Sequence, residues 1–223
     1  EYGYDDKGSS NEEELGSRIQ KLLHTVEEAV AFAEVPPATI SVTKLRPEDQ
    51  DVLGLDPARE KAVRREGTMA VLQHRIERAA SGKTSYLVRR AIDCLDRGYG
   101  QVMILTGLTS HAQELTARLR AAGEEVLVGT GDETSPADRQ AMVAEFRAGT
   151  RIILVGTIYA WMVGIDGLQG LPKVLIGMFP WNINATQLLG RFRRYGATRS
   201  SDIEIVQSRE TIEDQVYDTV IQK

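Results

Sequence analysis

Cysteine, histidine and long apolar runs are all scarce in this sequence of 223 residues. Its one cysteine, Cys94, cannot form a disulfide within the chain, and its three scattered histidines provide no metal-ligand spacing. The longest uncharged apolar stretch, Ile152–Ile165, is too short to cross a bilayer, and the acidic first residues contain no signal-peptide pattern. These absences exclude disulfide-stapled secreted domains, zinc fingers and membrane spans, and they indicate a reducing compartment.

A strong excess of charge of either sign is also absent. Lysine and arginine number 27 and aspartate and glutamate 32, which gives a net charge of −5 at pH 7. The apolar fraction of 42% and the charged fraction of 26% are those of an ordinary soluble globular protein, and they exclude wholesale disorder. A mildly acidic total argues against a protein that coats nucleic acid without specificity, but it leaves room for a local basic patch.

The first part of the chain changes composition twice. Residues 1–11 are polar and rich in glycine and serine, and we expect them to be a disordered lead-in. The pattern predicts that residues 12–80 are mostly helical, because apolar side chains recur at helical spacing from Leu15 to Val30 and Pro36-Pro37 ends that helix. A short extended segment follows at Ile40–Leu45.

From Ser81 onward, short apolar strands alternate strictly with helices. Ser135, Pro136 and Asp138 mark one helix start clearly, as N-cap, first helical residue and capping-box partner. The alternation predicts a doubly wound, mostly parallel α/β sheet over residues 81–223, with helices on both faces. The predicted strands are 102–106, 126–128, 152–155, 174–179 and 203–206, and the predicted helices are 84–97, 110–122, 136–147, 187–193 and one that starts at 211.

The segment Ser81-Gly82-Lys83-Thr84 matches the end of a phosphate-binding loop, but the rest of that motif is missing. The loop needs a glycine where Glu77 stands, and it needs a buried strand where residues 71–80 are charged and helical. No strand ends in paired carboxylates for Mg²⁺ either, because Asp132-Glu133 follows a glycine-rich loop. We therefore interpret the segment as a helix start, and a free-standing nucleotide-binding enzyme that uses Lys83 remains a rival.

The most informative pattern is Gln187-Leu-Leu-Gly190-Arg191-Phe-Arg-Arg194-Tyr-Gly196, which follows a predicted strand. It predicts Arg191 and Arg194 on one helical face beyond the carboxyl ends of the strands, where ligands bind in open α/β sheets. Guanidinium groups bind phosphate oxygens bidentately and can stabilise the charge on a transferring phosphoryl group. A solvated basic helix end is the alternative interpretation.

This spacing resembles motif VI of superfamily-two helicases and translocases, Q-x-x-G-R-x-x-R-x-G. Residues Thr157–Asp166, with Ala160 and Gly164, resemble motif V of the Swi/Snf-like branch, except that Asp166 stands where that branch has Asn. The resemblance covers residues 35–223, and its further matches, in chain order, are Ser81-Gly82-Lys83, Arg139-Gln140, Trp181-Asn182 and Thr211-Ile212-Glu213.

The resemblance implies a RecA-like helicase C-terminal lobe, which is the second half of a two-lobed motor that hydrolyses ATP. It also implies that residues 12–80 are a linker between the two lobes that braces the second one. In that family the first lobe carries the phosphate loop and the Mg²⁺-binding carboxylates, so this chain alone is expected to be inactive. The family implies Arg194 as the arginine finger and Arg191 as its catalytic partner. It also implies an ATP-binding set of Gln187, Gly190, Gly164 and Asp166, and it gives this lobe no metal ligand.

For the nucleic-acid partner, the resemblance implies DNA rather than RNA. The expected contact residues are Thr106 and Gly107 in motif IV, Thr157 in motif V, and Thr134 in a glycine-rich loop. Such contacts reach the phosphate backbone, so we expect little base specificity and strong salt dependence.

Besides the enzyme that would use Lys83, two alternatives to the DNA motor remain from sequence. One is an RNA-directed or restriction-type motor lobe, and the other is a non-catalytic RecA-like module that binds nucleic acid or protein. A bacterial or phage source, indicated by alanine- and arginine-rich helices, predicts a cytoplasmic protein with no membrane partner, whereas a eukaryotic source predicts a nuclear one.

Overall fold

The computed structural model describes residues 35–51, 57–131, 134–162, 165–180 and 185–216, with side chains from residue 61 onward in the second range. The predicted lead-in at 1–11 and the predicted helix at Leu15–Val30 lie outside the described residues. So do Asp132-Glu133, Gly164 and Trp181-Asn182.

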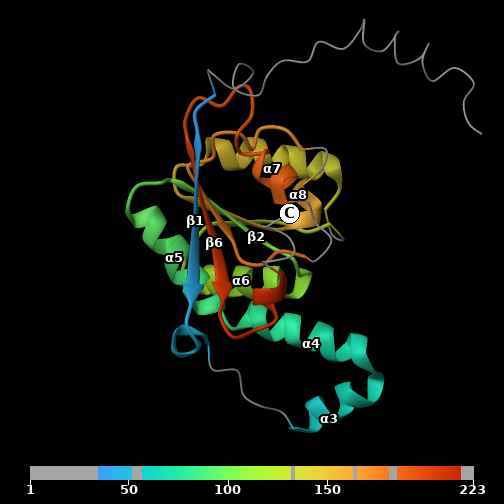
Figure 1. The fold of residues 1–223 in the computed structure, drawn as a ribbon. Helices are drawn as coiled ribbons and strands as arrows, with labels where there is room; N and C mark the ends of the chain where they lie inside the picture. The colour runs from blue at the N-terminus through green and yellow to red at the C-terminus, as the bar shows by residue number, and fades with distance from the viewer. Residues whose placement is uncertain (1–34, 52–56, 132–133, 163–164, 181–184, 217–223) are drawn as a thin grey trace, which may run out of the picture. The chain divides into compact units, whose positions relative to one another are not determined.

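The described residues form a six-stranded sheet in which every pairing is parallel. The order across the sheet is β1-β6-β5-β2-β4-β3 (Figure 1). This topology confirms the predicted doubly wound α/β architecture. The strands are β1 (Ala38–Leu45), β2 (Gln101–Thr106), β3 (Val126–Gly129), β4 (Ile152–Thr157), β5 (Lys173–Ile176) and β6 (Ser201–Ser208).

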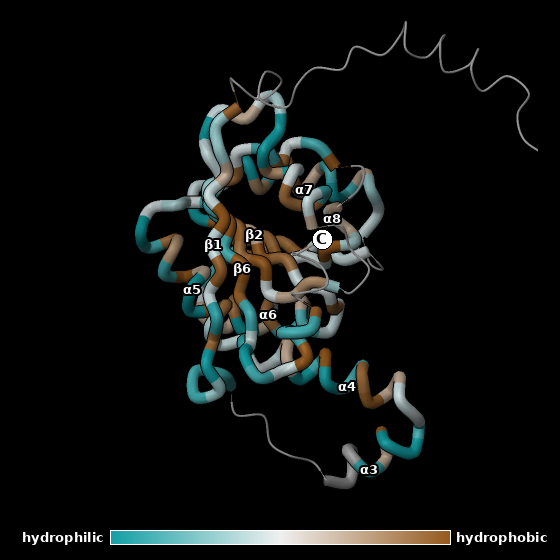
Figure 2. The backbone as a smooth tube through the Cα atoms, in the orientation of Figure 1, coloured by the Kyte–Doolittle hydropathy of each residue, from teal (hydrophilic) through white to brown (hydrophobic). Residues whose placement is uncertain are grey.

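Helices cover both faces of this sheet. Helices α5 and α6 lie on one face and α7 and α8 on the other (Figures 1 and 2), and apolar side chains of α5 and α6 pack in one core layer, those of α7, α8 and α9 in the other. None of the described helices is long and apolar enough to span a membrane. The helices are α3 (Pro57–Glu66), α4 (Thr68–Ser81), α5 (Thr84–Asp96), α6 (Thr109–Ala121), α7 (Pro136–Ala148), α8 (Ile158–Met162) and α9 (Ala185–Leu189), with a 3₁₀ turn η1 at Pro47–Asp49.

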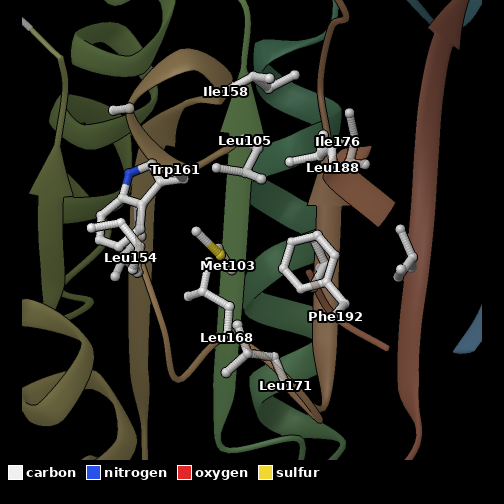
Figure 3. Close-up of a cluster of buried hydrophobic side chains, with 14 of the residues drawn as sticks. Met103, Leu105, Leu154, Ile158, Trp161, Leu168, Leu171, Ile176, Leu188 and Phe192 are labelled. Carbon is white, nitrogen blue, oxygen red and sulfur yellow. The ribbon is translucent and has the colours of Figure 1, made fainter. Parts of the chain in front are cut away.

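The core has two layers because successive strand residues point to opposite faces. In β2, Met103 and Leu105 join the layer under α7, α8 and α9 (Figure 3), whereas Val102 and Ile104 join the layer under α5 and α6. All four side chains are fully buried. Strands buried on both faces read as continuous apolar runs, which is why the sequence predicted them well.

Trp161 is the largest fully buried side chain, and it requires glycine on the neighbouring strands. Its indole Nε1 donates a hydrogen bond to the Gly129 carbonyl at 2.8 Å. A Cβ at Gly156 would lie 2.1 Å from that nitrogen, and a Cβ at Gly129 would lie 2.3 Å from the indole ring. The two glycines therefore make the space in which the tryptophan ring lies.

Strand β1 brings the segment predicted at Ile40–Leu45 into the main sheet. It pairs with β6 along its whole length, from Ala38 opposite Ser201 to Leu45 opposite Ser208. The sheet thus includes a strand from the region before residue 81. Because β1 is an edge strand, Ile40 and Val42 are 50% and 37% exposed.

A buried carboxylate fastens β6 to its neighbours. Glu204 accepts hydrogen bonds from Arg90 Nε at 2.9 Å, from Lys173 Nζ at 2.9 Å and from the Tyr86 hydroxyl at 2.9 Å. Burial raises the pKa of Glu204, but the hydrogen bonds from Arg90 and Lys173 outweigh it and lower the pKa to about 2. The carboxylate therefore stays charged and links β6, β5 and α5.

Candidate functional site

The carboxyl ends of β2, β3 and β4, with the residues that follow them, form one edge of the sheet, which we call the strand-end edge. Thr106 ends β2 and Thr157 ends β4, and the two residues are direct partners in the strand register. Gly107 follows Thr106, and Gly131 lies close enough to Thr157 for its N–H to donate to the Thr157 hydroxyl at 3.4 Å. The structure thus brings together the residues predicted from motifs IV and V.

The hydroxyl groups at this edge already have partners inside the protein. Thr106 is fully buried and Thr157 is 5% exposed. The Thr106 Oγ1 lies 2.8 Å from His111 Nδ1. Gly107 is partly exposed, so its backbone N–H is better placed to meet a ligand than either hydroxyl is.

The start of α7 organises two of the predicted loops. The Arg139 guanidinium donates to the Thr134 carbonyl, and the Thr134 N–H donates to the Thr130 carbonyl at 3.2 Å. The Gln140 side chain pairs with the backbone N–H and carbonyl of Asp166, each at 3.3 Å. Thr134 and Asp166 are therefore held by neighbouring residues of one helix, and the Asp166 side chain is exposed.

His111, in the first turn of α6, is a buried residue that the sequence reasoning did not single out. It is 2% exposed, and its Nε2 has no hydrogen-bond partner among the described residues. Burial lowers the pKa of His111 from 6.5 to about 3, and the positive charges of Lys83 and Arg118 act in the same direction. A histidine five residues after the strand-end threonine is the signal that could have identified this pair.

The buried neutral His111 predicts a pH dependence of stability. Between pH 6.5 and about 3 the unfolded chain binds a proton at this site and the folded chain does not. The free energy of unfolding should therefore fall by about 1.5 kcal/mol as the pH drops from 6.5 to 5. Urea unfolding across that range tests this.

The matched variants are His111→Asn, which should lose this slope, and His74→Asn, which should keep it. A slope that survives in His111→Asn would show that another group is responsible.

The Gln187–Gly196 segment is less helical than predicted. Helix α9 ends at Leu189, and the Arg191 and Phe192 N–H groups turn back to the carbonyls of Leu188 and Leu189 at 3.0 and 3.1 Å. The reason is Phe192, which is 1% exposed and packs into the core (Figure 3). The prediction that Arg191 and Arg194 share one helical face is therefore wrong, because both lie in the turns after the helix.

The two arginines are nevertheless available for a ligand. Arg191 is partly exposed and Arg194 is exposed, and neither guanidinium forms a hydrogen bond or ion pair within the described part of the chain. By contrast, Arg199 donates to the Gly170 carbonyl and to Gln101 at 2.9 and 2.8 Å. Gln187 and Gly190, at the end of α9 and just after it, are exposed beside them.

Lys83 has a structural role. It is fully buried, forms an ion pair with Glu213 and donates to the Val206 carbonyl at 3.1 Å. The Ser208 N–H donates to the same Glu213 carboxylate at 2.8 Å. Burial lowers the pKa of Lys83 and raises that of Glu213, against the attraction between the two charges. The ammonium group is committed to this pair, so Ser81–Thr84 does not form a phosphate cradle.

The described residues fit only part of an ATP site. Arg191 and Arg194 could hold phosphate oxygens, whereas Lys83 cannot. Over the described residues, no group of three or more His, Cys, Asp or Glu side chains could hold a metal ion.

No model of a known protein family and no curated protein sequence matches this chain at a significant level. The fold is similar to the crystal structure of the C-terminal part of the Fun30 ATPase domain, with a TM-score of 0.55 and 23% identity over 63% of this chain and 45% of that one. It is also similar to the Hef helicase domain of Pyrococcus furiosus, with a TM-score of 0.50 and 20% identity over 73% of this chain and 32% of that one. The chain thus spans less than half of either structure. At these identities the likeness shows the fold, and it confirms the RecA-like architecture expected for a helicase C-terminal lobe.

Proposed function

We propose that this chain is the second lobe of a two-lobed motor that moves along DNA by hydrolysing ATP. The observation that carries the proposal is the pair of guanidiniums, Arg191 and Arg194, that have no partner among the described residues. They lie in turns fixed by the buried Phe192, on a fold shared with the C-terminal part of an ATPase domain.

In this proposal, Arg194 and Arg191 reach an ATP site that a first lobe completes. Their planar forks bind phosphate oxygens bidentately, and their charge offsets the negative charge that develops during phosphoryl transfer. Because Phe192 anchors the turn, the two guanidiniums are preorganised near the positions from which they would contact the phosphates of ATP. ATP supplies the phosphoryl group and Mg²⁺ its charge neutralisation, both bound mainly by the first lobe. Gln187 and Gly190 shape the turn, and Asp166 with Gly164 links the ATP site to the strand-end edge.

The strand-end edge is the proposed DNA contact, through Thr106, Gly107, Thr157 and Thr134. Since the Thr106 and Thr157 hydroxyls have internal partners, we assign the direct contacts to backbone N–H groups such as that of Gly107. Backbone N–H groups bind phosphates without reading bases, so binding should depend weakly on sequence and steeply on salt.

The proposal is tested by measuring ATP hydrolysis with and without DNA, for this chain alone and for the complete two-lobed protein. We expect no turnover from the chain alone, because Lys83 is committed to Glu213, and DNA-stimulated turnover from the complete protein.

A folded complete protein that binds DNA without turnover would instead indicate a non-catalytic binding module. Stimulation by RNA but not by DNA would indicate the RNA-directed alternative.

A further inference from the structure

Helices α3 and α4 carry a concentration of positive charge that the proposed motor site does not use. Residues 57–81 contain six arginines and lysines and three glutamates, a net charge of +3 in a chain whose total is −5. The two helices contact each other and are joined at Gly67, whose φ of +107° makes the tight reversal. The basic charge is thus gathered on one helical hairpin.

A cleft of about 200 Å³ lies on this hairpin, and we call it the basic cleft. None of the described side chains that line it is acidic, whereas the neighbouring cleft that shares Arg75 and Arg78 also contains Asp51 and Glu210. The residues that line the basic cleft are Val63, Arg64, Val71, His74, Arg75 and Arg78.

Three polar groups of the basic cleft lack partners within the described part of the chain. The guanidiniums of Arg64 and Arg75 form no hydrogen bond or ion pair there, and His74 Nε2 is buried without a hydrogen bond. Unpaired buried polar atoms and clustered like charges both cost free energy, which an anionic ligand with several acceptor oxygens would remove. The chemistry of the cleft therefore fits phosphate groups.

The position of α4 indicates which phosphates these are. On its other side, Gln73 and Ile76 line a second cleft of about 250 Å³ together with Gly107 and Tyr159 of the strand-end edge. The basic cleft and the cleft at the proposed DNA contact thus lie on opposite sides of helix α4. A helix with its side chains is about 10–12 Å across, which corresponds to about three or four nucleotide steps at about 3.4 Å each.

We propose that the basic cleft binds phosphates of the same nucleic-acid strand that crosses the strand-end edge, with Arg64 and Arg75 as the contacts. This inference rests on the proposed function, since it extends the nucleic-acid site of that motor. It gives the lobe a second anchor on the backbone, a few nucleotides from the first.

The test compares DNA binding by the full chain and by the double variant Arg64→Gln/Arg75→Gln. Fluorescence anisotropy with a labelled DNA oligonucleotide is measured over a range of salt concentrations. We expect the variant to bind about tenfold more weakly at low salt, and its log–log salt slope to be smaller by about 1.5–2, the value for two lost phosphate contacts.

The matched control is Arg97→Gln/Arg151→Gln, which removes the same charge from exposed ion pairs elsewhere. It should bind DNA within about twofold of the unchanged chain. Arg64 and Arg75 are exposed, so the double variant should keep its thermal unfolding temperature, which confirms that a binding loss is local.

Three results would overturn this inference. One is equal binding and an equal salt slope in the Arg64/Arg75 variant. Another is displacement of the labelled oligonucleotide by inorganic phosphate when the phosphate concentration only equals that of the oligonucleotide's phosphate groups. That result would indicate a site for free anions. A third concerns polyglutamate, used as a probe for an acidic protein. If the Arg64/Arg75 variant loses polyglutamate binding but keeps DNA binding, the cleft binds an acidic protein partner.

Failure of this inference is separable from failure of the proposed function. If Arg194→Ala stops hydrolysis in the complete protein while the Arg64/Arg75 variant binds DNA normally, only the second anchor is wrong. If the Arg64/Arg75 variant loses DNA binding while the unchanged complete protein binds DNA without hydrolysing ATP, the motor role is wrong and the anchor stands.

Discussion

Replacing Arg194 by alanine is expected to lower DNA-stimulated ATP hydrolysis by the complete motor about 10³-fold or more. DNA binding by this chain should change by less than about twofold, because Arg194 lies outside the strand-end edge and the basic cleft. The physical reason is that the exposed Arg194 guanidinium has no partner among the described residues. Its positive charge can therefore stabilise the negative charge on a transferring phosphoryl group. Steady-state hydrolysis and fluorescence anisotropy on the same protein measure the two effects.

Two further variants make the Arg194 experiment specific. Arg194→Lys keeps the charge but loses the planar fork, so its turnover should lie between those of the alanine variant and the unchanged protein. Arg89→Ala removes an exposed arginine from α5, on the opposite face of the sheet, and should leave turnover unchanged. Turnover by Arg194→Ala within about twofold of the unchanged protein would refute the finger assignment.

Lys83→Ala is expected to lower the free energy of unfolding by about 3–5 kcal/mol. The substitution removes the partner of Glu213, a residue that is 5% exposed and whose carboxylate would remain buried beside the Ser208 N–H. It also leaves the Val206 carbonyl without its donor. Urea denaturation of the variant and the unchanged chain measures the difference.

Removing both charges separates the loss of attraction from the cost of an unpaired buried charge. The double variant Lys83→Met/Glu213→Leu should recover most of the stability lost in Lys83→Ala, since apolar side chains replace a buried ion pair at little cost. Lys61→Ala, on the exposed side of α3, is the control and should change stability by less than about 0.5 kcal/mol. A Lys83→Ala chain of normal stability whose motor cannot hydrolyse ATP would restore the phosphate-loop interpretation.

Local sequence patterns predicted most of the sheet and its helices. The apolar runs at 102–106 and 152–155 became β2 and β4, because strands buried on both faces need apolar residues throughout. The capping box at Ser135 and Asp138 is present as predicted, with both reciprocal hydrogen bonds formed. Strand β1 was harder to place, because a short extended segment carries no information about which distant strand it pairs with.

The site was predicted less completely, because its details depend on contacts between distant residues. The arginine spacing in 187–196 marked the segment, but helical periodicity could not show that Phe192 belongs to the core and ends the helix early. Lys83 and Glu213 lie in two segments that each resemble the family pattern. Their ion pair joins residues 130 positions apart in the sequence, so only the folded structure shows it. The contact between Thr106 and His111 was not predicted, because the spacing of the three histidines carries information about metal binding and none about this hydrogen bond.

The pairing of β1 with β6 also sets the order in which the sheet can form. Ser41 and Ile203, which are hydrogen-bonded in the completed sheet, are 162 residues apart in the chain. At about 5–20 residues per second, β1 leaves the ribosome roughly 10–30 s before β6, its neighbour in the described sheet. During that interval the inner strands can assemble next to one another, while Ile40 and Val42 stay uncovered in an unpaired strand. Closing the long loop between β1 and β6 therefore cannot come before the end of β6 synthesis, and until then the unpaired β1 strand is exposed to competition from aggregation.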